Sequence, residues 1–121
     1  MSKVILVVED QEDNRRILRD LLTSGGYKVI EALSGEDGVS AAETHRPDLI
    51  LMDIQLPGLD GYEATRRIKA IPDLRGTPII VVTSYALSGD DAKAFEAGCD
   101  AYVSKPFSPR ELLAKIREYL P

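Results

Sequence analysis

The chain of 121 residues has few of the features on which secreted, membrane-bound and nucleic-acid-binding proteins depend. Its one cysteine, Cys99, excludes an intrachain disulfide and favours a reducing compartment. Its apolar runs are too short for a membrane span, and the run near the N-terminus is too short for a signal peptide. The net charge of −5 argues against the basic surface that nucleic acids require. We therefore expect one soluble, cytoplasmic domain over residues 1–121, with neither membrane nor nucleic acid as a partner.

The chain does contain a regular alternation of apolar runs and helical patterns. The expected strands are residues 3–8, 27–32, 49–52, 79–82 and 100–103. Uninterrupted apolar runs are typical of strands buried on both faces, whereas the more polar segment 27–32 is expected near a sheet edge. The helices are expected to begin near Asp13, Ser34, Asp60, Gly89 and Ser108. This alternation predicts an α/β fold, with a parallel sheet covered by helices on both faces.

Two of these helices carry an apolar face that can be read from the spacing of their side chains. The first helix has an apolar stripe of Ile17, Leu18, Leu21 and Leu22. The helix over residues 89–97 has a weaker one, formed by Ala92, Phe95 and Ala97. We expect both faces to pack against the sheet.

Polar and charged side chains follow four of the strands at the point where each strand ends. In open parallel sheets the functional loops lie beyond the carboxyl ends of the strands. Those ends carry Glu9 and Asp10, Asp53, Thr83, and Lys105. Three carboxylates, a hydroxyl and an ammonium group are therefore expected to meet at one edge of the sheet.

Such a cluster has a limited choice of chemistry. Like charges about 4 Å apart repel by about 4 kcal/mol at an effective dielectric constant of about 20, so the cluster either raises a carboxyl pKa or recruits a cation. Oxygen ligands without His or thiolate suit a hard divalent ion, Mg²⁺ above all. Lys105 and Thr83 can contact phosphoryl oxygens, and Asp53 can act as a nucleophile. The pattern predicts metal-assisted phosphoryl transfer to Asp53.

Four segments carry a resemblance to a known family. They are Val-Val-Glu9-Asp10; Asp53-Ile-Gln-Leu-Pro57-Gly-Leu-Asp60-Gly61; Val-Val-Thr83-Ser84; and Tyr102-Val-Ser-Lys105-Pro106-Phe107. In this order and spacing, the chain resembles the receiver domain of two-component response regulators over essentially its whole length, and above all the single-domain CheY-like and DivK-like members. The resemblance implies a flavodoxin-like (βα)5 fold, a doubly wound five-stranded parallel sheet in the order 2-1-3-4-5.

The resemblance also implies a role for each matching site residue. Asp53 would accept a phosphoryl group from the phosphohistidine of a sensor histidine kinase or a histidine phosphotransfer protein. Asp10, Asp53 and the backbone carbonyl of Gln55 would bind Mg²⁺, and Glu9 would act through a water. Lys105 would pair with the phosphoryl group. The donor is expected to dock along the first helix, near Gln11, Asn14, Arg15 and Leu18.

A two-state switch is the further implication of the resemblance. Thr83 would hydrogen-bond to the phosphoryl group, and Tyr102 would turn inward as Thr83 moves. A downstream target would read the change on the face made by residues 89–97, residues 100–103 and the last helix. Pro57 and Gly61 would shape the loop after Asp53, and the bond from Lys105 to Pro106 would be cis. The protein would be a monomer or a phosphorylation-dependent dimer.

Other functions remain open at this point. The chain is expected to be free-standing, since it starts with Met1, but a receiver domain excised from a hybrid kinase or a larger regulator would carry the same residues. A phosphatase with an aspartate nucleophile and Mg²⁺ would place Asp-x-Asp after its first strand, whereas Asp53 follows the third and Gln55 takes the second acidic place. A flavodoxin-like cofactor binder would need a phosphate-binding loop, and the chain has neither a Walker A nor a GxGxxG run. A receiver that serves only as a scaffold is at odds with the complete acidic set. As a receiver, the protein would not be an enzyme beyond its own phosphorylation and slow autodephosphorylation.

Overall fold

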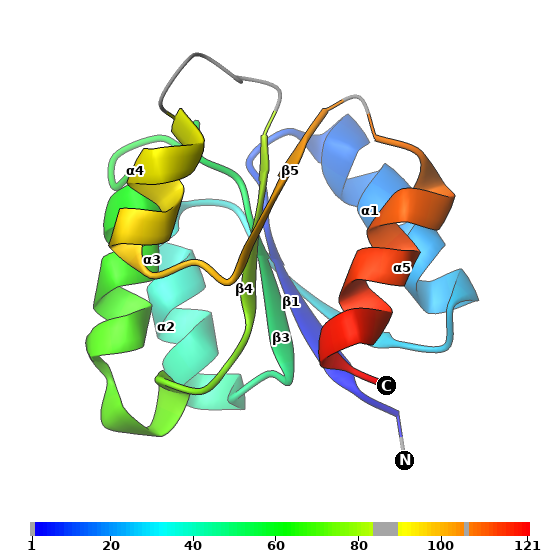
Figure 1. Ribbon diagram of the computed structural model, residues 1–121, viewed down its shortest axis with the longest axis horizontal. Helices are drawn as coiled ribbons and strands as arrows, with labels where there is room; N and C mark the ends of the chain where they lie inside the picture. Colours follow the sequence, from blue (N-terminus) through cyan, green and yellow to red (C-terminus); the bar gives the residue numbers. More distant parts are fainter. Residues whose placement is uncertain (1, 84–89, 106) are drawn as a thin grey trace.

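Five parallel strands form one sheet with α-helices on both of its faces (Figure 1). The computed structural model describes residues 2–83, 90–105 and 107–121, with Asp90 described by its backbone alone. The strands are β1 (Val4–Val8), β2 (Lys28–Ala32), β3 (Leu49–Met52), β4 (Ile79–Thr83) and β5 (Ala101–Ser104). Their order is β2-β1-β3-β4-β5, which confirms the predicted fold class and places the polar strand β2 at an edge.

Alternate residues of each strand enter two separate hydrophobic cores, because successive side chains of a strand point to opposite faces. Leu6, Val8, Ile50 and Met52 lie in the core beneath α2, α3 and α4. Ile5, Val7, Leu49 and Leu51 lie in the core beneath α1 and α5. Figure 1 shows these two groups of helices on opposite sides of the sheet. The central strands are therefore buried on both faces, as their uninterrupted apolar sequence predicts.

The helices begin where the sequence places a capping side chain. They are α1 (Glu12–Ser24), α2 (Gly35–His45), α3 (Gly61–Ala70), α4 (Asp90–Ala97) and α5 (Pro109–Tyr119). The side-chain oxygens of Ser34, Asp60 and Ser108 each accept a hydrogen bond from the backbone N–H three residues on, at 2.9–3.1 Å. None of the described helices is long and apolar enough to cross a membrane.

Two of the expected apolar faces are only partly correct. On α1, Leu18 and Leu22 are buried, but Ile17 is 59% exposed because it lies about 100° round the helix from Leu18, beyond the edge of the sheet contact. On α4, Phe95 is 51% exposed, and the residues that pack inward are Ala94 and Ala97. The sequence also gave no sign of the short 3₁₀-helix η1 (Pro72–Leu74), which follows α3 and buries Leu74.

The two ends of the chain lie together at the amino end of the sheet. Ser2 and Lys3, which precede β1, line one shallow depression of about 580 Å³ with Leu120 and Pro121, which follow α5. The carboxyl ends of the strands lie at the opposite end of the molecule (Figure 1).

Candidate functional site

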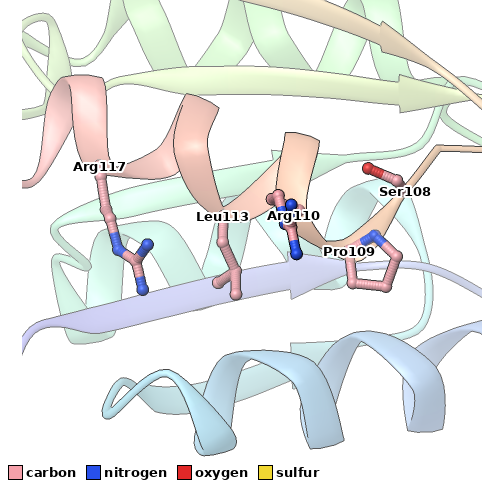
Figure 2. A pocket seen from close by; sticks show the side chains of 5 residues that line it. All are labelled: Ser108, Pro109, Arg110, Leu113 and Arg117. Atoms are coloured by element: carbon pink, nitrogen blue, oxygen red, sulfur yellow. The ribbon is translucent and has the colours of Figure 1, made fainter.

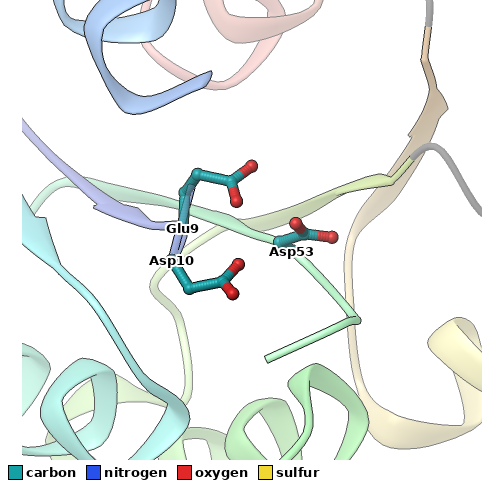
Figure 3. A group of neighbouring side chains, drawn as sticks. All are labelled: Glu9, Asp10 and Asp53. Atoms are coloured by element: carbon teal, nitrogen blue, oxygen red, sulfur yellow. The ribbon is translucent and has the colours of Figure 1, made fainter. Parts of the chain in front are cut away.

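Three carboxylates meet at the carboxyl end of the sheet. Glu9 and Asp10 follow β1, Asp53 follows β3, and these two strands are neighbours in the sheet. One oxygen from each of the three carboxylates lies within 4.8 Å of one from each of the others. Figure 3 shows the three side chains extending to the same side from the two strand ends. The cluster expected from the sequence is therefore present.

The backbone of this cluster is held by the sheet itself. The N–H of Glu9 donates to the carbonyl of Ala32 at 3.0 Å, and the N–H of Asp53 donates to the carbonyl of Val8 at 3.1 Å. These hydrogen bonds continue the parallel ladders one residue beyond the strands. The positions of Glu9 and Asp53 are thus fixed by their neighbours on the sheet.

Lys105 enters the cluster from the end of β5. Its backbone N–H donates to the carbonyl of Thr83 at 2.7 Å, and its ammonium group donates to Glu9 Oε1 at 2.8 Å. The same ammonium lies 3.8 Å from Asp53 Oδ2. All three of these charged side chains are largely buried, with exposed fractions of 16% for Lys105, 2% for Glu9 and 11% for Asp53. In this state Lys105 therefore bonds more closely to Glu9 than to Asp53.

This arrangement divides the two buried carboxylates by their proton affinity. Burial, followed by the negative charge of Glu9, raises the pKa of Asp53 to about 6, and the opposing charge of Lys105 does not offset this. Burial alone would also raise the pKa of Glu9, but its hydrogen bonds with Lys105 and with the N–H of Gln11 outweigh burial and lower it. Glu9 therefore keeps its charge at neutral pH, and Asp53 is the carboxylate whose charge is costly.

The donor set fits a small divalent cation better than it fits a second buried amine. The described cluster offers carboxylate oxygens and no nitrogen or sulfur ligand, which is the ligand set of Mg²⁺. Ligands at about 2.1 Å from an ion can be at most about 4.2 Å apart, so a cluster within 4.8 Å needs only a small adjustment to enclose one. Glu9, Asp10 and Asp53 can thus hold Mg²⁺ together.

The other expected site residues lie around this cluster. Thr83 ends β4 and is fully buried, and Tyr102 on the neighbouring strand β5 is half-buried with its hydroxyl oxygen shielded from solvent. The backbone N–H of Gln55 donates to Asp53 Oδ1 at 3.4 Å, so the loop after β3 bends back over the carboxylate. Ser84 and Pro106, and with Pro106 the expected cis bond, lie outside the described residues.

The loop from Asp53 to Gly61 is held from below by helix α2. The N–H of Leu59 donates to Glu36 Oε1 at 3.0 Å. Gly61 packs against the backbone of Asp53 and Ile54 so closely that a Cβ there would overlap the carbonyl oxygen of Asp53. Gly61 therefore has the structural role expected of it, because only glycine allows this close approach. Pro57 is exposed within the same loop.

A larger depression of about 670 Å³ lies elsewhere, along α5. It is lined by Ser108, Pro109, Arg110, Leu113 and Arg117, and Figure 2 shows the last three projecting from one side of the helix. Its lining contains no carboxylate and no nucleophile activated by a neighbour, so it offers none of the chemistry of the acidic cluster. Size alone would point to the wrong place on this surface.

One part of the site was not anticipated in the sequence. The side chain of Arg15, expected among residues that face a partner, is 13% exposed and turns toward the acidic loop. It donates to the backbone carbonyls of Glu9 and Asp10. No spacing rule relates an arginine on a helix to carbonyl groups five and six residues earlier, so only the structure places it there.

The fold and the site together define a class of protein. A five-stranded α/β sheet with acidic side chains after β1 and β3, a hydroxyl after β4 and a lysine after β5 is the pattern of a phosphoryl-accepting signalling domain. A family model for the response regulator receiver domain matches residues 5–117. The chain therefore belongs to the response regulator receiver family of two-component systems.

Individual relatives agree with this assignment. The polar-differentiation response regulator DivK of Brucella ovis is 43% identical over 120 residues, which cover 99% of this chain and 98% of that protein. The receiver domain of a sensor histidine kinase from Pseudomonas aeruginosa, solved with a magnesium ion coordinated in its active-site cleft, is 41% identical with a TM-score of 0.93, and the match covers 99% and 98% of the two chains. A chemotaxis protein CheY4 of Vibrio cholerae, 24% identical with a TM-score of 0.92 and coverage of 98% and 99%, shares the fold.

Proposed function

We propose that this protein, as one receiver domain over residues 1–121, is a phosphorylation-controlled switch whose phosphoacceptor is Asp53. An oxygen of the Asp53 carboxylate forms a bond to phosphorus, while the bond from phosphorus to the imidazole nitrogen of a partner's phosphohistidine breaks and leaves its electron pair on that nitrogen. The observation that carries the proposal is the meeting of Glu9, Asp10, Asp53 and Lys105 at one sheet edge. Among them Asp53 has the nearby cation and the destabilised negative charge.

The neighbouring residues have distinct parts in this chemistry. Asp10, Asp53 and the backbone carbonyl of Gln55 hold Mg²⁺, and Glu9 reaches the ion through a water. Mg²⁺ supplies positive charge to the oxygens of the transferred group. Lys105, now bonded to Glu9 at 2.8 Å and 3.8 Å from Asp53, moves its ammonium group to the phosphoryl oxygens once Asp53 carries them. Catalysis is limited to the protein's own phosphorylation and slow autodephosphorylation.

The signal passes to other proteins through two surfaces. The phosphodonor, a sensor histidine kinase or a histidine phosphotransfer protein, docks at α1 beside an apolar depression of about 420 Å³ whose lining includes Ile17, Phe107 and Lys105. This explains why Ile17 is exposed although it is apolar. The downstream target binds the face made by α4, β5 and α5, which presents Phe95.

That output face changes when Asp53 is phosphorylated. Thr83, at the end of β4, donates its hydroxyl to a phosphoryl oxygen, and Tyr102 on β5 adjusts with it. The protein works in the cytoplasm, as a monomer or as a phosphorylation-dependent dimer. A receiver within a larger hybrid kinase is the alternative context, since a histidine-kinase receiver matches this chain about as well as a DivK does.

Intact-mass measurement tests the proposal directly, and suits a chain that has no tryptophan to report the reaction by fluorescence. With Mg²⁺ and a small phosphodonor such as acetyl phosphate, the wild-type chain gains the mass of one phosphoryl group, and Asp53→Asn gains none. Asp60→Asn is the matched control, because Asp60 lies in the same loop, is exposed and caps α3, as asparagine also does. It is phosphorylated like wild type.

Two results would replace the proposal with another. A wild-type chain that gains no mass with any donor leaves only a scaffold role. Rapid multiple turnover of assorted phosphomonoesters, dependent on Asp53, identifies a phosphatase instead.

A further inference from the structure

Arg15 joins the metal-binding loop to a part of the protein outside the site. It lies in the first turn of α1, and its Nη1 donates to two successive backbone carbonyls, those of Glu9 at 3.1 Å and Asp10 at 3.0 Å. These are the residues whose carboxylates form two corners of the acidic cluster. One guanidinium nitrogen therefore fixes the chain on both sides of the peptide bond between them.

Glu31 on the edge strand β2 holds Arg15 in place. Its Oε1 lies 3.4 Å from Arg15 Nε, on the other side of the guanidinium from the two carbonyls. The same carboxylate also accepts two hydrogen bonds at 3.0 Å from Arg19 Nη1, one turn further along α1. Because β2 pairs with β1, with Glu31 opposite Val7, this anchor belongs to the sheet and not to a surface loop.

The contact acts through geometry more than through charge. A free guanidinium beside the cluster would repel a divalent cation, but the negative charge of Glu31 lies against this one and offsets it. What remains is the orientation of the loop. Glu9 and Asp10 lie between β1 and α1 in neither element, so without Arg15 the direction of the Asp10 side chain would rest on fewer contacts. Groups that orient metal ligands from outside typically change metal affinity by about 10–100-fold.

We propose that Arg15 is a positioning residue for the metal site, which sets the affinity for Mg²⁺ by holding the backbone of Glu9 and Asp10 from its anchor on Glu31. This inference rests on the proposed function, since it assumes that the acidic cluster binds Mg²⁺. It assigns Arg15 no contact with the phosphoryl group or with the ion.

Arg15→Met tests the proposal, with Arg15→Lys and Arg19→Met beside it. Mg²⁺ affinity is read from the amide chemical shifts of Asp10 and Asp53 during a magnesium titration. We expect Arg15→Met to weaken Mg²⁺ binding about tenfold, at the low end for such groups. Arg15→Lys keeps the charge but its single ammonium cannot span both carbonyls and Glu31, so we expect a similar loss. Arg19→Met removes the same charge from the same partner without touching the loop, and we expect a change of less than about twofold.

A second readout separates positioning of the ion from damage to the reaction. At saturating Mg²⁺, Arg15→Met is phosphorylated by acetyl phosphate at a rate within about twofold of wild type, because Asp53 and Lys105 are intact and only the metal affinity has changed. Urea unfolding of each variant without Mg²⁺ shows whether the fold is kept. If Arg15→Met does not fold, Glu31→Gln, which leaves Arg15 in place without its charged anchor, is expected to weaken Mg²⁺ binding in the same direction.

The outcomes distinguish this inference from the function on which it rests. A wild-type chain that shows no Mg²⁺-dependent shifts and no phosphorylation overturns the proposed function and the inference together. A wild-type chain that titrates normally while Arg15→Met titrates identically overturns the inference alone. Full recovery of affinity in Arg15→Lys, or an equal loss in Arg19→Met, also overturns it, since either result makes charge and not the carbonyl contacts the cause.

Discussion

Replacing Asp53 by asparagine is expected to make the protein more stable at neutral pH while it removes the phosphoacceptor. The side chain of Asp53 is 11% exposed, and burial and the charge of Glu9 raise its pKa from an ordinary 3.8 to about 6. The ionised carboxylate is thus less favourable in the folded chain than in the unfolded one. Asparagine has nearly the same shape and no charge, so Asp53→Asn removes this cost.

The size and the pH dependence follow from the two pKa values. A difference of about two pKa units, at about 1.36 kcal/mol each, corresponds to about 3 kcal/mol of unfolding free energy. Because the folded pKa is the higher one, the full cost applies above about pH 6, where Asp53 is ionised in both states. It shrinks as the pH falls through 6, and disappears below 3.8, where both states are protonated. Asp53→Asn should therefore be more stable than wild type by about 2–3 kcal/mol near pH 7.5 and by almost nothing near pH 4.

Urea unfolding followed by circular dichroism, in buffer containing EDTA, measures both quantities. Asp60→Asn, an exposed carboxylate in the same loop, should change the free energy of unfolding by less than about 0.5 kcal/mol. Mg²⁺ should then stabilise wild type more than Asp53→Asn, since the ion offsets the repulsion between Glu9 and Asp53. An Asp53→Asn variant no more stable than wild type near neutral pH, or one whose gain persists unchanged in acid, would refute the reasoning.

Two further predictions concern the surroundings of the site. Gly61→Ala places a Cβ against the carbonyl oxygen of Asp53 and should lower the free energy of unfolding by about 1–3 kcal/mol, whereas Gly76→Ala, where a Cβ meets nothing within 4 Å, should leave it nearly unchanged in the same urea assay. Cys99 is 6% exposed, and burial followed by the charge of Asp100 raises the pKa of its thiol to about 11, so it should react with a disulfide reagent far more slowly in the native chain than in urea; equal rates would contradict this.

The strands were the most predictable part of the fold. Residues 49–52 and 79–82 carry no polar side chain, which only a strand buried on both faces tolerates at that length, and both are strands of the described sheet. The polar strand 28–32 lies at an edge because its neighbour on one side is solvent. Strand order came from the family resemblance, since alternation alone does not fix it.

The helix surfaces were less predictable because periodicity gives the direction of an apolar stripe but not its covered width. Ile17 and Phe95 both sit beside buried residues in the helical pattern, yet each is more than half exposed. How far the sheet extends under a helix decides this, and that is a property of the packed molecule. The 3₁₀-helix after α3 likewise depends on how the chain turns toward β4.

For the site, the sequence predicted which residues would meet but not how they would pair. The carboxyl ends of parallel strands share an edge, so Glu9, Asp10, Asp53 and Lys105 could be brought together without a structure. That Lys105 bonds at 2.8 Å to Glu9 and lies 3.8 Å from Asp53 depends on side-chain conformations that no spacing rule gives. The functions of Thr83, Tyr102 and Gln55 in the switch remain predictions.

The adjacency of the two chain ends has a practical consequence. They meet at the amino end of the sheet, and the five residues of β1, at about 3.3 Å each, separate that end from the acidic cluster by roughly 16 Å. A sensor surface or a fluorophore attached at either end therefore leaves the carboxylates facing solvent. A short linker can also join the ends, so that a circularly permuted chain opened in a surface loop keeps the same order of strands and the same four-residue cluster.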